Sequence, residues 1–193
     1  MKTCWFRPGH GLLIAISLIC LLAGRLAQAG SATWKADPIS NDWNTAANWT
    51  PESVPNGPSD LARFAGSGVT NVKFSSVIIE VAEIVFTPAA GSFNLTADSD
   101  LAHTSVTLTI SGHGITNNSA VTQNLTANPN GANFGLGTIE FRNAATAGGG
   151  TLLTALGSSR EGGFSGSEIN FYDTSTAATA SFVAEGATGS LDA

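Results

Sequence analysis

The chain has 193 residues, of which 11% are charged and 22 are glycine, and its formal net charge is −6. A charged fraction this low excludes a protein built from long solvent-exposed helices, which need far more Glu and Lys. The acidic balance excludes nucleic acid as a partner, because a negative surface repels phosphate backbones.

Residues 1–29 have the composition of a secretion signal. Lys2 and Arg7 make the start positive, residues 12–23 are apolar, and residues 27–29 (Ala-Gln-Ala) form a small-x-small cleavage site. The apolar stretch is short for a bilayer span. We therefore predict that residues 1–29 are a signal peptide that is cleaved after Ala29.

Both cysteines, Cys4 and Cys20, lie in this predicted signal. The mature chain is therefore predicted to have no disulfide framework, no cysteine-ligated metal and no cysteine nucleophile. Three of the eight basic residues also fall in the signal and all 14 acidic residues follow it, so the mature net charge is 5 − 14 = −9. Arg25 lies close to the cleavage site, and an uncleaved membrane anchor is the alternative.

Residues 30–66 differ in composition from the rest of the chain. They hold Trp34, Trp43 and Trp49 together with four of the seven prolines. Stacked strands leave an open edge of unpaired N–H and C=O groups, and large aromatic rings can close the end of an apolar column. We predict that this Trp/Pro-rich segment is an N-terminal cap.

Residues 67–193 are predicted to be a repeat region of short strands divided by turns. Apolar and polar residues alternate with the strand period of two, and no helical apolar stripe occurs outside the signal. The apolar runs are Val77/Ile79/Val81, Ile84/Phe86, Phe93/Leu95/Ala97 and Val106/Leu108/Ile110. Residues 111–114 (Ser-Gly-His-Gly) are predicted to form a tight turn.

One stretch of the repeat region returns later in the chain at a constant offset of 30 in the numbering. Residues 137–166 are echoed by residues 167–193, so that Ile139 corresponds to Ile169, Phe141 to Phe171 and Leu152 to Phe182. A fixed period of this size is typical of repeat architectures, in which each unit buries its apolar face against its neighbour.

These patterns predict an all-β protein, a right-handed parallel β-helix (β-solenoid) of about four coils from Val69 onward. Equivalent residues stack, so Asn143 and Asp173 are expected to share one corner, and residues 148–150 (Gly-Gly-Gly) a corner without room for side chains. A β-sandwich would have longer strands and no echo. Disorder is the other alternative for a Gly-rich polar chain.

The last residues show no capping segment. The second echo is the last complete unit, and residues 186–192 follow it directly. We therefore expect a truncated array that belongs to a longer repeat protein.

Two blocks resemble the passenger regions of bacterial autotransporter-like surface proteins. Residues 43–51 (WNTAANWTP) with 54–60 (VPNGPSD) are similar to the opening of those passengers, and residues 108–119 (LTISGHGITNNS) to the unit before their β-helical repeats. The resemblance implies export, a parallel β-helix and a place on or outside the cell surface, and often adhesion or an unknown function. The family's membrane barrel or sorting tail has no counterpart in residues 67–193.

Metal sites are not predicted. His103 and His113 are the only histidines after the signal, and Asp98 or Asp100 would be needed as a further ligand. The Asp98-Ser99-Asp100 cluster lacks the glycine and downstream Glu of a calcium loop. Both patterns are better interpreted as solvent-exposed turns, and no cofactor is predicted.

Catalytic residues are not predicted either. Acid–base cleavage of polysaccharides needs paired carboxylates, or a base beside a basic residue. Asp173 with Arg142 of the preceding coil is the best pair that the echo offers, and Arg142 is expected to lie over Tyr172. We interpret this pair as a solvent-facing contact.

The asparagines are predicted to be structural. Asn117, Asn118, Asn128, Asn130 and Asn143 fall at predicted turns, where an Asn side chain bonds backbone groups and tolerates left-handed conformations. Asn-x-Ser/Thr also occurs at Asn48, Asn94, Asn117 and Asn124. These sites would carry glycans only in a eukaryotic secretory pathway.

Together these observations predict a secreted, non-catalytic, adhesin-like surface protein that presents an extended β-helical face. It would be exported through the periplasm to the cell surface or the medium. The expected partners are surface polysaccharide or a host or matrix protein, with no nucleic acid and no small-molecule substrate. The alternatives are a polysaccharide lyase or hydrolase on the same fold, and a non-functional fragment of a longer passenger.

Overall fold

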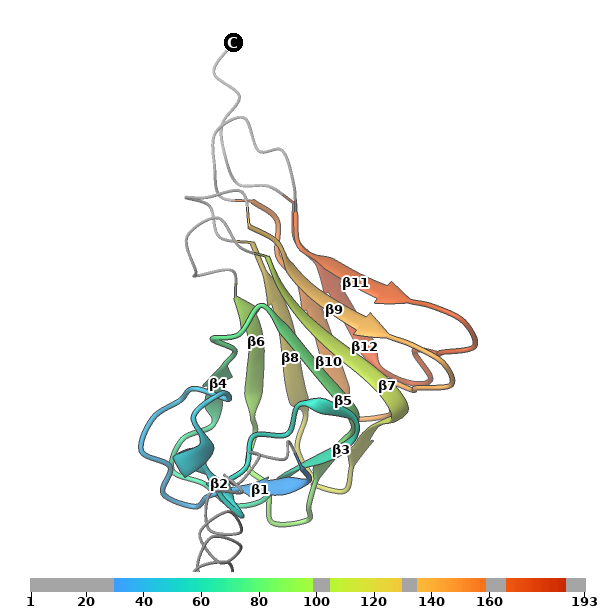
Figure 1. The fold of residues 1–193 in the computed structure, drawn as a ribbon. Coiled ribbons are helices and arrows are strands. Elements are labelled where there is room, and N and C mark those ends of the chain that lie inside the picture. Colours follow the sequence, from blue (N-terminus) through green and yellow to red (C-terminus); the bar gives the residue numbers. More distant parts are fainter. Residues whose placement is uncertain (1–29, 99–104, 130–134, 159–165, 187–193) are drawn as a thin grey trace, which may run out of the picture.

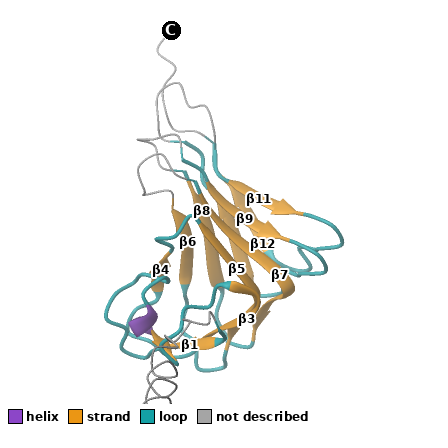
Figure 2. Cartoon of the chain, in the orientation of Figure 1, coloured by secondary structure: helices purple, strands orange, loops and turns teal. Residues whose placement is uncertain are grey.

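The computed structural model describes residues 30–98, 105–129, 135–158 and 166–186. These residues form a β-solenoid of about five turns with almost no helix (Figures 1 and 2). Each turn contributes one strand to each of two sheets, and successive turns pair in parallel. The predicted signal, residues 1–29, lies outside the described residues.

Sheet A has seven strands in the order β11-β9-β7-β5-β3-β1-β2, and sheet B has five in the order β12-β10-β8-β6-β4. The strands of sheet A are β1 (Ala32–Trp34), β2 (Trp49–Thr50), β3 (Gly57–Phe64), β5 (Ile78–Phe86), β7 (Val106–Asn117), β9 (Gly137–Phe141) and β11 (Glu168–Phe171). Those of sheet B are β4 (Asn71–Lys73), β6 (Asn94–Asp98), β8 (Gln123–Asn128), β10 (Thr151–Ala155) and β12 (Ser181–Ala184). A 3₁₀ turn, η1 (Ala46–Asn48), precedes β2.

The predicted stacking of the two echoes is confirmed. Strand β11 pairs with β9 at an offset of 30 in the numbering, with Ile169 on Ile139 and Phe171 on Phe141. The two phenylalanine rings lie 4.7 Å apart, 5° from parallel. In this part of the chain, residues one sequence period apart are therefore paired in neighbouring strands.

Inward side chains form continuous apolar columns along the solenoid. In sheet A, one column is Val81, Ile110, Phe141 and Phe171, and in sheet B another is Val72, Leu95, Leu125, Leu153 and Phe182. The members before the last turn are fully buried. Since burying one such side chain stabilises the fold by roughly 1.5–3 kcal/mol, these columns hold the turns together.

The predicted correspondence of Leu152 with Phe182 is wrong by one residue. Leu152 pairs with Ser181, and Leu153 pairs with Phe182. Thr146 bridges Thr176, so the connection to β10 is one residue longer than its counterpart. Residues 148–150 contain the extra residue, and Gly148 and Gly150 have φ of 71° and 66°, conformations that glycine adopts without strain.

The predicted tight turn at residues 111–114 is also wrong. These residues lie within β7, which runs continuously from Val106 to Asn117. The register with β5 shifts there: Val81 pairs with Ile110, but Glu83 pairs with Gly114. The segment is therefore a bulge that bends the strand. Gly114 has φ of 101°, and a Cβ there would overlap the backbone of Thr146.

The solenoid has about five turns rather than the four expected, because the first turn begins inside the predicted cap. Strand β3 pairs in parallel with β5 and so belongs to the stack. Ahead of it, β1 pairs with β3 in parallel and with β2 antiparallel.

Three tryptophans close the first end of the core. Trp34, Trp43 and Trp49 are fully buried, with Trp49 in edge contact with the other two at 5.0 and 4.8 Å. Each indole N–H donates to a backbone carbonyl, those of Val69, Pro55 and Trp43 respectively. The rings thus bury a large apolar area without leaving a polar atom unpaired.

The register of β5 gives a matched pair of stability predictions. Ile79 is fully buried in the core, whereas its neighbour Ile78 is 64% exposed. We expect Ile79→Ala to lower the free energy of unfolding by about 2–5 kcal/mol, and Ile78→Ala by less than about 1 kcal/mol. Urea denaturation followed by circular dichroism measures both, and equal losses would contradict the register.

Candidate functional site

The outward face of sheet B carries aligned polar side chains. Asn94 lies beside Asn124, and Thr96, Thr126 and Thr154 form one row across β6, β8 and β10. We call these five residues the Thr/Asn ladder. Adjacent strands of a sheet lie about 4.8 Å apart, so the ladder repeats its hydroxyl and amide groups at that interval.

The ladder arises from a second echo that the sequence analysis missed. Asn-Leu-Thr-Ala occurs at residues 94–97 and again at 124–127, which is the same offset as between β9 and β11. Leu95 and Leu125 enter the core, so the alternation of a strand places the flanking Asn and Thr on the outer face. This repeated four-residue sequence is the feature from which four of the five ladder residues could have been predicted.

The ladder side chains are half-buried and partly bonded to each other. The Thr126 hydroxyl donates to Asn94 Oδ1 at 3.2 Å, and Asn124 Nδ2 donates to the Phe93 carbonyl at 3.4 Å. These contacts restrict the rotamers of the side chains. A preorganised row of neutral donors and acceptors loses less conformational entropy on binding than a mobile one.

Gln123 holds the start of the ladder strands in place. Its side chain is fully buried, and its Oε1 accepts from the Phe93 N–H at 2.9 Å while its Nε2 donates to the Gly91 carbonyl at 2.9 Å. The side chain therefore replaces backbone partners where β6 begins. Its amide spans adjacent turns and fixes their relative position.

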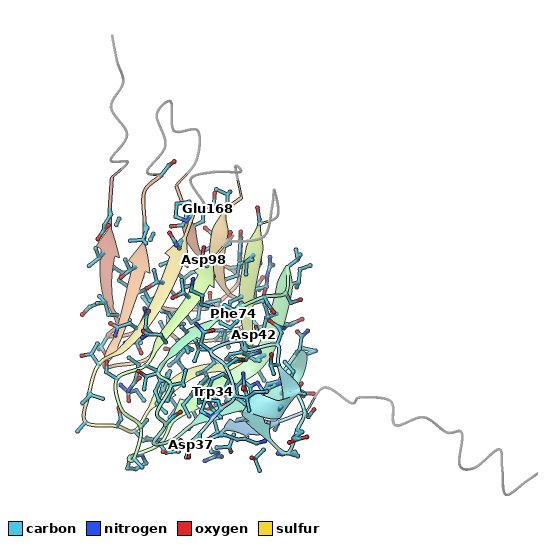
Figure 3. All side chains as sticks on the ribbon, turned by 90° about the vertical axis from the view of Figure 1, so that its left-hand side faces the viewer. Trp34, Asp37, Asp42, Phe74, Asp98 and Glu168 are labelled. Atoms are coloured by element: carbon cyan, nitrogen blue, oxygen red, sulfur yellow. The ribbon has the colours of Figure 1, made fainter. Side chains whose placement is uncertain are left out.

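Charges near the ladder compensate each other. Lys73 Nζ contacts Asp98 Oδ2 at 3.2 Å, across β4 and β6. Asp98 ends β6, near the same edge of the molecule as Glu168 (Figure 3). The five ladder residues themselves are uncharged, so the face favours a neutral ligand over an ionic one.

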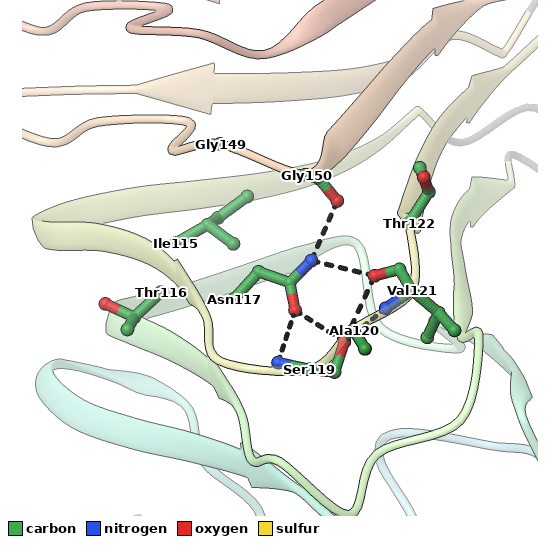
Figure 4. Close-up of a pocket in the computed structure, with 9 residues that line it drawn as sticks. All are labelled: Ile115, Thr116, Asn117, Ser119, Ala120, Val121, Thr122, Gly149 and Gly150. Atoms are coloured by element: carbon green, nitrogen blue, oxygen red, sulfur yellow. Dashed lines mark hydrogen bonds between the residues drawn. The ribbon is translucent and has the colours of Figure 1, made fainter.

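A pocket of about 540 Å³ lies where the turn after β7 meets the glycine corner before β10 (Figure 4). Asn117 forms part of its wall, with Nδ2 donating to the carbonyls of Gly150 and Val121 and Oδ1 accepting from the backbone N–H and hydroxyl of Ser119. None of the nine lining residues is titratable. The pocket therefore offers no acid–base group.

Of the candidate metal ligands, only His113 and Asp98 lie within the described residues. His113 is 89% exposed, with its Nδ1 3.9 Å from Glu83, and Asp98 is engaged by Lys73. Asp100 and His103 lie outside the described residues. Among the residues that the structure describes, no group of three His, Cys, Asp or Glu side chains could hold a metal ion.

Arg142 and Asp173 do not form the expected pair. Arg142 Nη2 contacts Glu140 Oε2 of β9 at 2.8 Å, and its hydrogen bond and charge contact with Glu140 raise the pKa of the guanidinium. Asp173 instead accepts from the Asn143 backbone N–H at 2.9 Å. The guanidinium does lie over the Tyr172 ring, at 4.4 Å, as the echo predicts.

The shared corner of Asn143 and Asp173 is confirmed. Both residues are left-handed, with φ of 56° and 58°. Asn143 Nδ2 also donates to the Ser111 carbonyl at 2.7 Å. Asn48 lies in η1 and is fully buried, so this glycosylation motif is inaccessible in the folded chain.

Comparisons with other proteins give no match to this chain. No protein-family model matches it, and neither the curated proteins nor the solved structures yield a similar protein. In the described part of the chain, no helix is long and apolar enough to cross a membrane. Function must therefore be argued from the geometry.

Gln123 provides a test of how the ladder is held. Gln123→Leu leaves the Phe93 N–H and the Gly91 carbonyl without their buried partner, at about 1–3 kcal/mol per group. We expect a corresponding loss of unfolding free energy in urea, with Thr122→Val, an exposed neighbour, changing it by less than about 0.5 kcal/mol. Equal effects of the two variants would contradict the anchoring role.

Proposed function

We propose that this chain is an exported, non-catalytic surface protein whose Thr/Asn ladder binds neutral polysaccharide. The observation that carries the proposal is the register of sheet B, which aligns three threonines and two asparagines on one outward face. A rigid row of hydroxyl and amide groups is chemically matched to the hydroxyl groups of a sugar chain.

Adhesion by such a face depends on many weak contacts. One neutral hydrogen bond contributes about 0.5–1.5 kcal/mol net, too little alone for useful affinity. An extended polysaccharide that runs along the ladder would contact several strands at once, and contacts on a rigid scaffold add with little further loss of entropy. The resulting binding would be broad in specificity and of modest affinity.

A carbohydrate-active enzyme on the same fold has less support. The carboxylate of Glu140, in β9, is paired with the guanidinium of Arg142, which directly follows this strand. The pocket beside Asn117 has no carboxylate or histidine in its wall. Binding without cleavage agrees better with this distribution of groups.

Export is proposed from the composition of residues 1–29 and from the resemblance to autotransporter-like passengers. A parallel β-solenoid agrees with that resemblance, although the fold alone does not specify a function. The acidic balance of the chain also suits a surface domain that stays dispersed, because like-charged molecules repel each other.

Replacement of the ladder threonines tests the proposed binding. We expect the triple variant Thr96→Val, Thr126→Val, Thr154→Val to bind insoluble neutral polysaccharides, such as cellulose or chitin, at least tenfold more weakly. The reason is that three hydrogen bonds of about 1 kcal/mol each are lost while side-chain volume is kept. Pull-down isotherms on a panel of neutral and charged polysaccharides measure the change.

Thr107→Val on sheet A is the matched control, since Thr107 faces outward on β7. It should bind like the unmodified chain. Failure to bind any polysaccharide, or equal binding by the triple variant, would reject the ladder as the site. Release of new reducing ends or unsaturated sugars would instead support the enzyme.

The predicted export has a direct readout. When the chain is produced in an exporting bacterium, we expect the secreted or periplasmic product to begin at Gly30, because residues 27–29 fit signal peptidase. N-terminal sequencing or intact-mass measurement determines the first residue. A product that keeps residues 1–29 and stays in the membrane would support the uncleaved anchor.

A further inference from the structure

The solenoid has β1, β2 and β4 at one end and β11 and β12 at the other, and the two ends differ in how their outer edges are bonded (Figure 1). At the first end, the Lys73 N–H donates to the Asn41 carbonyl, and the Lys73 carbonyl accepts from the Trp43 N–H. The outer edge of β4 is therefore hydrogen-bonded. The outermost strand of sheet A there, β2, has only two residues and is followed by Pro51. Short strands and proline are features that prevent further strand pairing.

The opposite end consists of β11 and β12, which we call the outer rung. At the end of β11, the Tyr172 N–H donates to the Phe141 carbonyl and so points toward β9. The backbone groups of successive residues in a strand point to opposite edges, so the N–H and C=O groups of Ile169 and Phe171 point to the outer edge. In β12, Phe182 is 50% and Val183 41% exposed. Among the described residues, none bonds to these outer edges, and apolar side chains lie beside unpaired backbone groups.

We propose that the outer rung pairs with the outer rung of a second copy of this chain, giving a dimer with twofold symmetry. Head-to-tail stacking is blocked because the first end is closed by tryptophans and proline. A twofold axis brings open edge to open edge and pairs β11 antiparallel with the second β11. The two β12 strands meet in the same way, and Phe182 of each copy leaves solvent.

The side chains of β11 fit this arrangement. With Asn170 on the axis, Ile169 of one copy faces Phe171 of the other, which continues the apolar column of the core. Glu168 faces Tyr172, so no like charges are opposed, and opposed like charges would destabilise the pair. In the alternative arrangement, β11 of one copy would pair antiparallel with β12 of the other. If Asn170 faced Val183 in that pairing, Glu168 would face Glu185, and the two like charges would repel each other.

The dimer joins sheet B of one copy to sheet B of the other. Two Thr/Asn ladders then lie on one continuous face, on either side of the axis. A long ligand that spans both would bind more tightly than either ladder alone allows, because the second contact is intramolecular.

Cysteine crosslinking tests the register. In the 193-residue chain with Cys4→Ala and Cys20→Ala, Asn170→Cys places two thiols on the axis, where opposed Cα atoms lie about 4.5–5.5 Å apart and a disulfide fits. We expect mild oxidation to give a disulfide-linked dimer. Asn124→Cys, outward on the interior strand β8, is the matched control and should stay monomeric. Equal crosslinking of both variants, or of neither, overturns the proposed register.

Sedimentation equilibrium tests the dimer itself. We expect the unmodified chain to dimerise and Asn170→Lys to dissociate at least tenfold more readily, because two lysines would face each other on the axis. Asn124→Lys should leave the dissociation constant within twofold, and circular dichroism checks that both variants fold. A chain that stays monomeric, or an Asn170→Lys variant that dimerises equally, rejects the proposal. Both results are independent of polysaccharide binding.

Discussion

The structure depends on parallel register between successive turns. Each inward side chain lies on its equivalent one turn away, as Phe171 lies on Phe141, and the backbone bonds between turns hold that alignment. Because strand side chains alternate, a slip of one residue would move a whole apolar row to the solvent side. The core columns therefore fix which residues face outward. The Thr/Asn ladder is aligned because the leucines beneath it are aligned.

The turns absorb the variation in repeat length so that the strands can keep this register. Offsets between residues of paired parallel strands range from 22 to 31, from Leu61 on Glu83 to Glu83 on Gly114. The extra residues are placed in the bulge of β7 and in the corner before β10. Left-handed residues occur at such places because they reverse the chain within little space. Substitutions at the corners would thus change the alignment of the ladder residues without contacting them, because the corners set the register of the strands.

Sequence reasoning succeeded where the period was constant. The offset of 30 gave the fold and the contact of Ile169 with Ile139, and it could also have given Asn124 beside Asn94. It failed where a corner changes length: Thr154 lies beside Thr126 at an offset of 28, and Leu152 beside Ser181 at 29. The length of a corner depends on its backbone conformation, and the residue types allow several conformations without fixing one. The place of Thr154 in the ladder therefore follows only from the strand pairing in the structure.

The stability of one turn and the association of two chains depend on the same interaction. In a solenoid each turn is stabilised by its neighbours, and among the described residues the outer rung contacts one neighbouring turn. Ile169 and Phe171 accordingly remain partly exposed, whereas their equivalents Ile139 and Phe141 are fully buried. Pairing with a second copy would give the outer rung its missing neighbour. The same contacts that order this rung would then double the length of the binding face.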